Sequence, residues 1–191
     1  PKKAEALYRK MEKEMFIEIE KNPVEAMSEG SKSMKCRQIA AGAIYTENGV
    51  KWENIHDEKL AALESIIEEN PEMPIIVSYH FKSDLEKLRL KFPGAETLNN
   101  DPTVEQRWND GKIPMLLVHP NANAHGLNLQ DGGNIIVFYS MDWRLEEHLQ
   151  IIERIGPMRQ KQSGHARSVF VHYLMMQDTI DEDMFERLSS K

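Results

Sequence analysis

The sequence predicts an α/β protein with a doubly wound parallel sheet, helices on both faces of that sheet, and a helical N-terminal appendage before it. Two observations support this fold class. Residues 75–191 alternate short apolar runs with amphipathic segments, which is the order expected of parallel strands joined by crossover helices. Residues 1–74 contain amphipathic segments but no apolar run of comparable strength. We therefore expect two domains, over residues 1–74 and 75–191.

Five apolar runs are predicted to form the strands, and we expect them to be buried on both faces of the sheet. They span residues 75–79, 95–98, 115–119, 135–138 and 169–173. With the segments between them, the predicted order is β-α-β-α-β-loop-β-α-β-α. In a sheet of this kind, ligands bind beyond the carboxyl ends of the strands.

Capping patterns predict where three helices of this region begin. Ser83-Asp-Leu-Glu86 and Thr103-Val-Glu-Gln106 have the spacing of a capping box, in which two side chains bond each other's backbone N–H. Thr179-Ile-Asp-Glu182 has the same pattern and is expected to start the last helix.

The appendage is predicted to contain three helices, over residues 4–20, 31–41 and 57–69, with Asp57 as the N-cap of the third. Asn48-Gly49 favours a tight turn, so a small hairpin is predicted between residues 44–46 and 50–52. Met11, Met15, Phe16 and Ile19 have helical spacing, which indicates core packing of the first helix.

Composition excludes several classes of protein. The chain has 191 residues, of which 40% are hydrophobic and 29% charged, and no apolar run reaches the roughly 20 residues of a membrane helix. One cysteine, Cys36, cannot form an internal disulfide, which favours a reducing cytoplasmic compartment. The first residues carry no signal-peptide pattern, and we expect the chain to begin inside a longer protein.

Charge is distributed unevenly along this acidic chain, whose net charge is −7. Residues 154–177 carry four basic residues and no acidic one, whereas residues 178–186 carry five acidic residues. The basic island is either a solvated surface or a binding surface for phosphate. The net charge argues against a protein covered in nucleic-acid-binding surface.

The polar loop over residues 120–134 joins two predicted strands where a helix would be expected. Gly126 allows a phosphate to approach the backbone closely, and Asn123, His125, Asn128 and Gln130 offer neutral hydrogen bonds to phosphate or sugar. An Asn- and Gly-rich loop can also be simple turn chemistry.

Cationic side chains follow in the next predicted helix, over residues 143–160, where Arg154 and Arg159 come after Gln150. A phosphoryl-transfer enzyme needs a cation that reaches the γ-phosphate, because neutralising charge in the transition state carries most of the catalysis. The alternative is a surface helix with two solvated arginines.

These two segments resemble motifs of one family. Gly126-Leu-Asn-Leu-Gln130 resembles the fifth helicase motif of the Swi/Snf-like branch of superfamily two, and Gln150 with Arg154 resembles the start of its sixth. Residues 76–86 resemble the fourth motif, residues 34–40 the helix that enters this lobe, and residues 169–182 the strand and helix that close it. The resemblance covers nearly the whole chain and is strongest to compact phage and prophage versions.

The resemblance implies the C-terminal RecA-like lobe of an ATP-dependent DNA translocase or helicase. Arg154 or Arg159 would act catalytically on ATP, with nucleotide contacts from Gly126, Asn128, Gln130, Gln150 and Arg154. DNA, expected to be double-stranded, would be contacted by Ser78, His80, Lys82, Asn121, Asn123 and His125. ATP and Mg²⁺ would be bound mainly by an N-terminal RecA-like lobe of the same protein.

The chain departs from the family pattern at one position. The sixth motif has a second arginine three residues after the first, and here that position is Pro157. The transition-state arginine is therefore either Arg154 or Arg159. Pro157 also favours an alternative, a non-catalytic module that keeps the fold and binds DNA or a protein. An unrelated α/β transferase for a sugar nucleotide is a third possibility.

Several expected motifs do not occur in the sequence. No Gly-x-x-x-x-Gly-Lys-Ser/Thr phosphate loop and no Asp-Glu-x-His box is found, so the chain alone is predicted not to hydrolyse ATP. The seven histidines lack the spacing of metal ligands, and no metal site is predicted.

Overall fold

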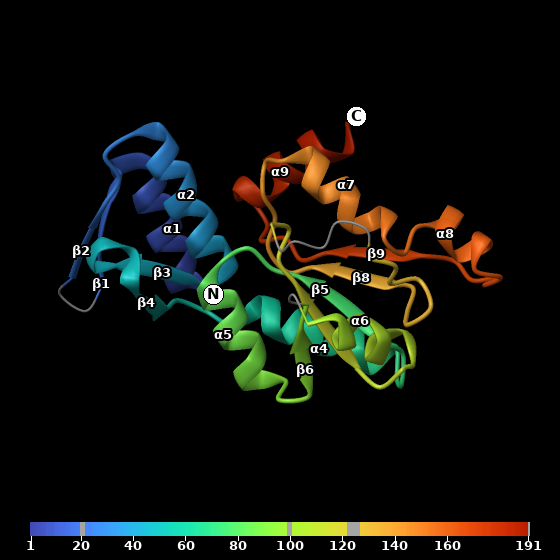
Figure 1. Ribbon diagram of the computed structural model, residues 1–191. Coiled ribbons are helices and arrows are strands. Elements are labelled where there is room, and N and C mark those ends of the chain that lie inside the picture. The colour runs from blue at the N-terminus through green and yellow to red at the C-terminus, as the bar shows by residue number, and fades with distance from the viewer. Residues whose placement is uncertain (20–21, 99–100, 122–126, 191) are drawn as a thin grey trace. The chain divides into compact units, whose positions relative to one another are not determined.

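The computed structural model describes residues 1–19, 22–98, 101–121 and 127–190. They form two compact units, one made of residues 1–61 with 175–191 and the other of residues 62–174 (Figure 1). These bounds differ from the predicted division after residue 74. Residues 62–74 pack with the sheet, and the C-terminal helix packs with the N-terminal segment.

The second unit is built on a five-stranded parallel sheet with the order β6-β7-β5-β8-β9 (Figure 1). Its strands are β5 (Ile75–Ser78), β6 (Ala95–Thr97), β7 (Met115–Val118), β8 (Ile135–Phe138) and β9 (Phe170–Tyr173). The predicted strands and their order along the chain are therefore confirmed. The helices are α4 (Glu58–Glu69), which begins in the first unit, α5 (Lys82–Lys91), α6 (Pro102–Asn109), α7 (Leu145–Glu153) and α8 (Pro157–Gln162).

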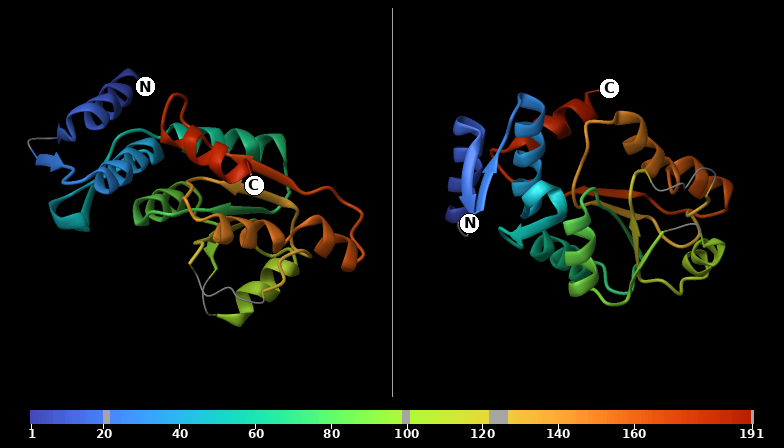
Figure 2. Two further views of the ribbon diagram at one scale, coloured as in Figure 1. Left: turned by 90° about the horizontal axis from the view of Figure 1, so that it is seen from above. Right: turned by 60° about the vertical axis from the view of Figure 1, so that its left-hand side comes forward.

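The direction of each crossover decides which face a helix covers. The steps β6 to β7 and β8 to β9 run the same way across the sheet, so right-handed crossovers put α6 and α7 on one face. Figure 2 shows these two helices together, with α4 on the opposite face. The step from β5 to β6 runs the other way, so a right-handed crossover places α5 on the face opposite α6 and α7.

Burial differs between the inner and the edge strands. Every residue of β5, β7 and β8 is buried, as predicted. The edge strands β6 and β9 are only partly buried, and Phe170 is exposed, so the prediction of burial on both faces was wrong for these two. An edge strand has a neighbour on one side only, which leaves part of its surface to solvent.

Two helix starts are capped by other residues than predicted. The Asp84 carboxylate accepts from the backbone N–H of Phe81 at 2.9 Å, so α5 begins at Lys82 and Ser83 lies inside it. Asp101 accepts from the backbone N–H of Thr103 at 2.9 Å and caps α6. In both cases a carboxylate lies within reach of the first turn and takes the bond instead of a hydroxyl. Thr179 caps the last helix, as predicted.

The first unit contains more strand than the sequence indicated. Two antiparallel hairpins are present, β1 (Phe16–Ile19) with β2 (Asn22–Glu25), and β3 (Ala43–Thr46) with β4 (Lys51–Asn54). The second is the predicted hairpin, with the short α3 (Glu47–Val50) as its turn. Three longer helices complete the unit, α1 (Lys2–Glu14), α2 (Glu29–Ala41) and α9 (Ile180–Ser189).

The helix predicted over residues 4–20 ends six residues early, because Met15 adopts a left-handed conformation with φ 58°. That turn sends residues 16–19 into β1, where Ile17 is fully buried and Phe16 is exposed. Pairing with β2 satisfies the strand's backbone groups, and Ala26 N–H donates to the Met15 carbonyl at 2.7 Å. Met11, Met15, Phe16 and Ile19 therefore do not form one helical stripe.

Polar contacts join the C-terminal segment to this unit. The Lys59 ammonium and the Asp181 carboxylate are 2.7 Å apart, with side chains only 2% and 3% exposed. The Tyr8 hydroxyl accepts from the backbone N–H of Ile180 at 2.7 Å. Both pairs bridge more than 100 residues of sequence, which explains why the last helix packs here rather than on the sheet.

One loop of the second unit is held in place by an aromatic side chain. The indole N–H of Trp108, on α6, donates to the Leu129 carbonyl at 2.8 Å, and Trp108 is fully buried. A Cβ added at Gly132 would lie 2.4 Å from Trp108. The loop between β7 and β8 therefore needs glycine there to close onto α6. Among the described residues, no helix combines the length and apolar character needed to cross a bilayer.

Replacing Lys59 with methionine should destabilise the first unit by about 3–5 kcal/mol, because it leaves the Asp181 carboxylate buried without its cation. Chemical denaturation followed by circular dichroism measures this. Lys112→Met is the matched control, since its ion pair with Asp110 is exposed and should change stability by less than about 1 kcal/mol. Equal effects of the two substitutions would contradict the assignment.

Replacing Gly132 with alanine should cost about 1–3 kcal/mol, because the methyl group collides with Trp108. Thermal unfolding provides the measurement. Gly30→Ala is the control: its Cβ would meet only the Ser28 hydroxyl, at 3.9 Å, so it should leave the melting temperature unchanged or higher. A Gly132 variant as stable as the Gly30 variant would show that the loop is not tightly packed on α6.

Candidate functional site

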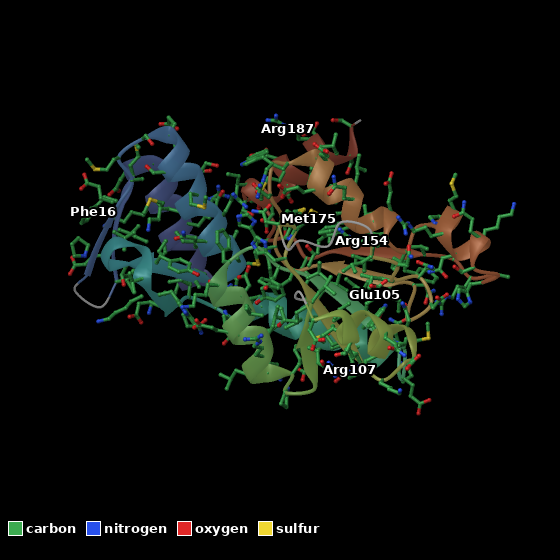
Figure 3. The ribbon with its side chains drawn as sticks, in the orientation of Figure 1. Phe16, Glu105, Arg107, Arg154, Met175 and Arg187 are labelled. Carbon is green, nitrogen blue, oxygen red and sulfur yellow. The ribbon has the colours of Figure 1, made fainter. Side chains whose placement is uncertain are left out.

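Most of the predicted site residues that the structure describes lie in or beside two groups of side chains on the second unit, and both groups also include residues that were not predicted. One group, the strand-end cluster, lies just after β5, β7 and β8 and consists of His80, Asp84, His119, Asn121, Ser140, Asp142 and Arg144. The other, the arginine cluster, brings together α6, the loop before β8, and the helix pair α7 and α8. It consists of Glu105, Asn128, Arg154 and Arg159; Figure 3 labels Glu105 and Arg154.

A buried carboxylate organises the strand-end cluster. Asp84 is completely buried, and one of its oxygens accepts from the Ser140 hydroxyl at 2.6 Å and from the Phe81 N–H. The Ser140 hydroxyl in turn accepts from the backbone N–H of His80 at 2.8 Å. These bonds join the turn after β5, the turn after β8 and the start of α5, so the carboxyl edge of the sheet is rigid.

Two histidines lie side by side on this edge. The rings of His80 and His119 are stacked with centroids 5.6 Å apart. His119 Nδ1 accepts from the backbone N–H of Asn121, which leaves Nε2 as the protonated nitrogen that donates to the His80 carbonyl at 3.1 Å. The neutral imidazole of His119 therefore fixes the direction in which the chain leaves β7.

Arg144 connects the segment after β8 to the segment after β7 at this edge of the sheet. Its guanidinium pairs with Asp142 at 2.7 Å and with Glu147 at 2.5 Å, and it donates to the Asn121 side chain at 3.0 Å. Two carboxylates thus surround one cation, so this cluster gains little positive charge from it. Arg144 and Ser78 also line a small cavity of about 10 Å³, which is at the lower limit of the space that one water molecule needs.

The residues predicted to contact DNA differ in accessibility. Lys82 is exposed, Asn121 is exposed and His80 is partly exposed. Ser78 is completely buried, and its hydroxyl has no hydrogen-bond partner among the described residues. It lies behind the surface that His80 forms, because it is the last residue of a central strand. Asn123 and His125 lie outside the described residues.

The arginine cluster joins two segments that are far apart in sequence. The Arg159 guanidinium donates to the Asn128 side-chain oxygen, and the Asn128 backbone N–H donates to Glu105 Oε1 at 2.8 Å. Asn109 Nδ2 also donates to the Asn128 carbonyl, at 2.7 Å. The loop before β8 is thereby held between α6 and α8. Gly126, predicted to contact ATP, lies outside the described residues.

Arg154, at the C-terminal end of α7, is only 9% exposed. Burial lowers the pKa of its guanidinium, and the nearby Arg159 cation lowers that pKa further, while the Glu105 carboxylate raises it. Arg154 therefore lies within electrostatic range of both Arg159 and Glu105. Two guanidinium groups against one carboxylate leave the cluster positively charged.

Gln130 and Gln150, which were also predicted to contact ATP, donate hydrogen bonds to other residues. Gln150 donates to Glu146 along its own helix, at 3.3 Å. Gln130 is buried; its amide donates to the Ser163 hydroxyl at 3.0 Å, while its side-chain oxygen has no hydrogen-bond partner among the described residues. Gln130 therefore offers an acceptor, and its own position is fixed by the packing of the loop.

Two residues that the sequence did not identify hold the same loop by its carbonyls. Gln160 Nε2 donates to the carbonyls of Gln130 and Gly133, at 3.1 and 3.0 Å. Arg167 donates to the Gln130 carbonyl at 2.5 Å and to Gln160 Oε1 at 2.8 Å. Arg167 belongs to the basic island of the sequence, but its guanidinium donates hydrogen bonds to backbone carbonyls of this loop. Glu105 was also missed, since no pattern marks a carboxylate that meets a distant loop.

Pro157 occupies the first position of α8, where a missing backbone N–H costs nothing. The chain turns at Gly156, and α8 then carries Arg159 back toward Asn128. The donor set of the arginine cluster fits a phosphate group: two guanidiniums, one of them held by the loop. The same set fits the nucleotide that the sequence resemblance implies.

Known proteins match the part of the chain that contains both clusters. Residues 58–159, more than half of the chain, match the family described as the helicase conserved C-terminal domain. The chain is 51% identical, over all 191 residues, to "Putative protein p41" of Acyrthosiphon pisum secondary endosymbiont phage 1, and covers 42% of that protein. It is 26% identical over 103 residues to "Helicase swr1" of Schizosaccharomyces pombe, which is 53% of this chain and 8% of that protein. The chain thus spans less than half the length of these relatives.

Solved structures with similar folds are themselves parts of helicases and ATPases. The C-terminal part of the Fun30 ATPase domain has a TM-score of 0.58 at 16% identity, with 70% of this chain and 46% of that one covered. The Pyrococcus furiosus Hef helicase domain has a TM-score of 0.50 at 16% identity, over 71% of this chain and 27% of that one. The RecA-like sheet and the Swi/Snf-like, phage-type resemblance are confirmed, and the chain belongs to the helicase conserved C-terminal domain family.

Proposed function

We propose that this chain is the C-terminal lobe of an ATP-dependent DNA translocase or helicase, and that it works against an N-terminal ATP-binding lobe of the same protein. Lobes of its family belong to ATP-dependent helicases. In this proposal Arg154 and Arg159 contact the ATP phosphates, and the carboxyl edge of the sheet contacts a DNA backbone. The partner lobe supplies the phosphate loop and the Mg²⁺ ligands that this sequence lacks.

The observation that carries the proposal is the meeting of Arg159 with Asn128. The hydrogen bond between them joins the helix pair that holds both arginines to the loop before β8. Arg154 is buried in the same place, where a cation interacts with phosphate more strongly than it would in water. Contact with phosphate across a closing cleft is what a transition-state arginine requires.

Bound ATP with Mg²⁺ would supply the phosphoanhydride whose hydrolysis drives the motion. The chain's own residues have three tasks. Arg154 and Arg159 neutralise charge on the phosphates, and Asn128 orients Arg159 through its side-chain oxygen. Glu105, Gln160 and Arg167 keep the loop in register with the arginines.

The loop offers a route from nucleotide to DNA. Its two ends follow β7, where His119 and Asn121 lie, and precede β8, where Gln130 lies. Closure of the lobes around ATP would shift the arginine cluster, and the rigid strand-end cluster would carry that shift to the DNA backbone. Lys82, His80 and Asn121 are the accessible groups there.

Pro157 favours a second candidate, a binding module without ATPase activity. It stands where the family has its second arginine. Because Gly156 and Pro157 start a new helix that returns Arg159 to the cluster, the position can be filled from two residues further on. ATP hydrolysis decides between the two candidates.

In the protein that joins this chain to its N-terminal lobe, substituting the transition-state arginine should lower DNA-stimulated ATP turnover by about 10³- to 10⁵-fold. Arg154→Ala and Arg159→Ala are compared by kcat, with nucleotide binding measured separately and expected to survive. Arg89→Ala is the control, because Arg89 is exposed and bonds Thr97 on another part of the unit. Full turnover in both arginine variants would overturn the proposed function in favour of a binding module.

The isolated chain should bind duplex DNA weakly, with an affinity that falls as salt rises, because the contacts are to phosphates. Lys82→Ala should reduce the slope of log K against log salt concentration by about one unit, since it removes one phosphate contact. Fluorescence anisotropy with duplex, single-stranded and RNA probes measures this, and Lys112→Ala is the control. A binding constant independent of salt would contradict phosphate contacts.

A further inference from the structure

Glu105 occupies a position that the proposed function does not use for contact with ATP or DNA. It lies in the middle of α6 and is partly buried. Its Oε1 accepts from the backbone N–H of Asn128 at 2.8 Å, across 23 residues of sequence. A carboxylate accepting a backbone N–H makes a charge-assisted bond, which is stronger than a neutral one.

Asn128 extends this contact to the arginines. Its side-chain oxygen accepts from Arg159, so a single residue bonds Glu105 through its backbone and Arg159 through its side chain. The charges of both residues act on Arg154. Its pKa is lowered by burial and by the Arg159 cation, and it is raised by the Glu105 carboxylate. One loop residue therefore connects the Glu105 carboxylate to the Arg159 guanidinium.

Asp131, an acidic residue of this loop, has a different partner. Asp131 accepts from His165 Nε2 at 2.8 Å, and the Asp131 backbone carbonyl accepts from Arg167. Its charge acts on Arg167, whose pKa it raises against the effect of burial. Glu105 is therefore the acidic group that acts on Arg154 and on the Asn128 peptide.

We propose that Glu105 is a positioning residue that serves as counter-charge to Arg154 and Arg159 before nucleotide binds, and that gives way to the ATP phosphates when the lobes close. This inference rests on the proposed function of the two arginines. The Glu105 carboxylate and the ATP phosphates attract the same two arginines. The interaction of either one with the arginines therefore weakens that of the other. ATP binding is then coupled to the loop, because the group displaced from the arginines also holds the Asn128 N–H.

This arrangement has a specific kinetic consequence. A counter-charge that must be displaced stabilises the nucleotide-free state and not the transition state, so its removal should favour ATP binding without raising kcat. Keeping the hydrogen bond while removing the charge separates the two roles of Glu105. Glutamine does this, since its side-chain oxygen can accept from the Asn128 N–H.

The experiment uses the protein that contains both lobes and compares Glu105→Gln, Glu105→Ala and Glu105→Asp. Glu105→Gln should lower KM for ATP about two- to fivefold, the range expected for loss of a charge–charge interaction near the surface, with kcat unchanged. Glu105→Asp keeps the charge and should restore a KM close to that of the wild type. Asp110→Asn is the matched control, because it removes one negative charge from the end of the same helix, where Asp110 pairs with Lys112.

Amide hydrogen exchange at Asn128 provides a second readout. Glu105→Gln should keep the protection of this amide, and Glu105→Ala should lose it, which confirms that the hydrogen bond and the charge are separable. The inference would be overturned if the KM of Glu105→Gln were no lower than that of the wild type and of Asp110→Asn. Arg154→Ala and Arg159→Ala, measured in parallel, keep the two proposals apart: if turnover survives in both, the proposed function fails, whatever Glu105 does.

Discussion

The loop between β7 and β8 imposes the constraint on which the rest of the site depends. It connects two parallel strands that lie on either side of β5, and no helix occurs in its described residues, 119–121 and 127–134. A crossover without a helix cannot satisfy its own backbone, so side chains must do so. Its carbonyl groups accept from Trp108 on α6, from Gln160 on α8 and from Arg167 before β9. One of its N–H groups donates to Glu105 on α6.

This way of holding the loop also assembles the arginine cluster. The residues that fix the loop come from the same helices that carry or adjoin Arg154 and Arg159, so a shift of either arginine changes the loop as well. Gly132 and Gly133 allow the loop to pack directly on Trp108 and the Pro74 carbonyl. The result is a site in which charge, backbone and packing are coupled over a short distance, as the proposed function requires.

The strand-end cluster shows the opposite character. Asp84, Ser140 and the backbone of residues 80 and 81 form a closed set of short hydrogen bonds, and Arg144 is balanced by two carboxylates. Such an edge is rigid, and it carries no net positive charge, because its one arginine is matched by two carboxylates. In the proposed function this edge would contact a DNA backbone only weakly, in agreement with the acidic net charge of the chain.

The sequence by itself determined the parallel sheet, the positions of its five strands along the chain and the family, because buried strands are marked by continuous apolar runs and the fifth and sixth motifs are local patterns. It also located Arg154, Arg159 and Asn128, each within a short motif. It misplaced the end of α1 and the caps of α5 and α6, where a turn at Met15 and the carboxylates of Asp84 and Asp101 outweighed local propensity. Only the tertiary structure decided that Lys59 meets Asp181, that Arg167 donates to a backbone carbonyl, and that Glu105 accepts from the Asn128 N–H. These pairings join segments 23 to 122 residues apart, and the energy of a contact between distant segments leaves no periodic mark in either one.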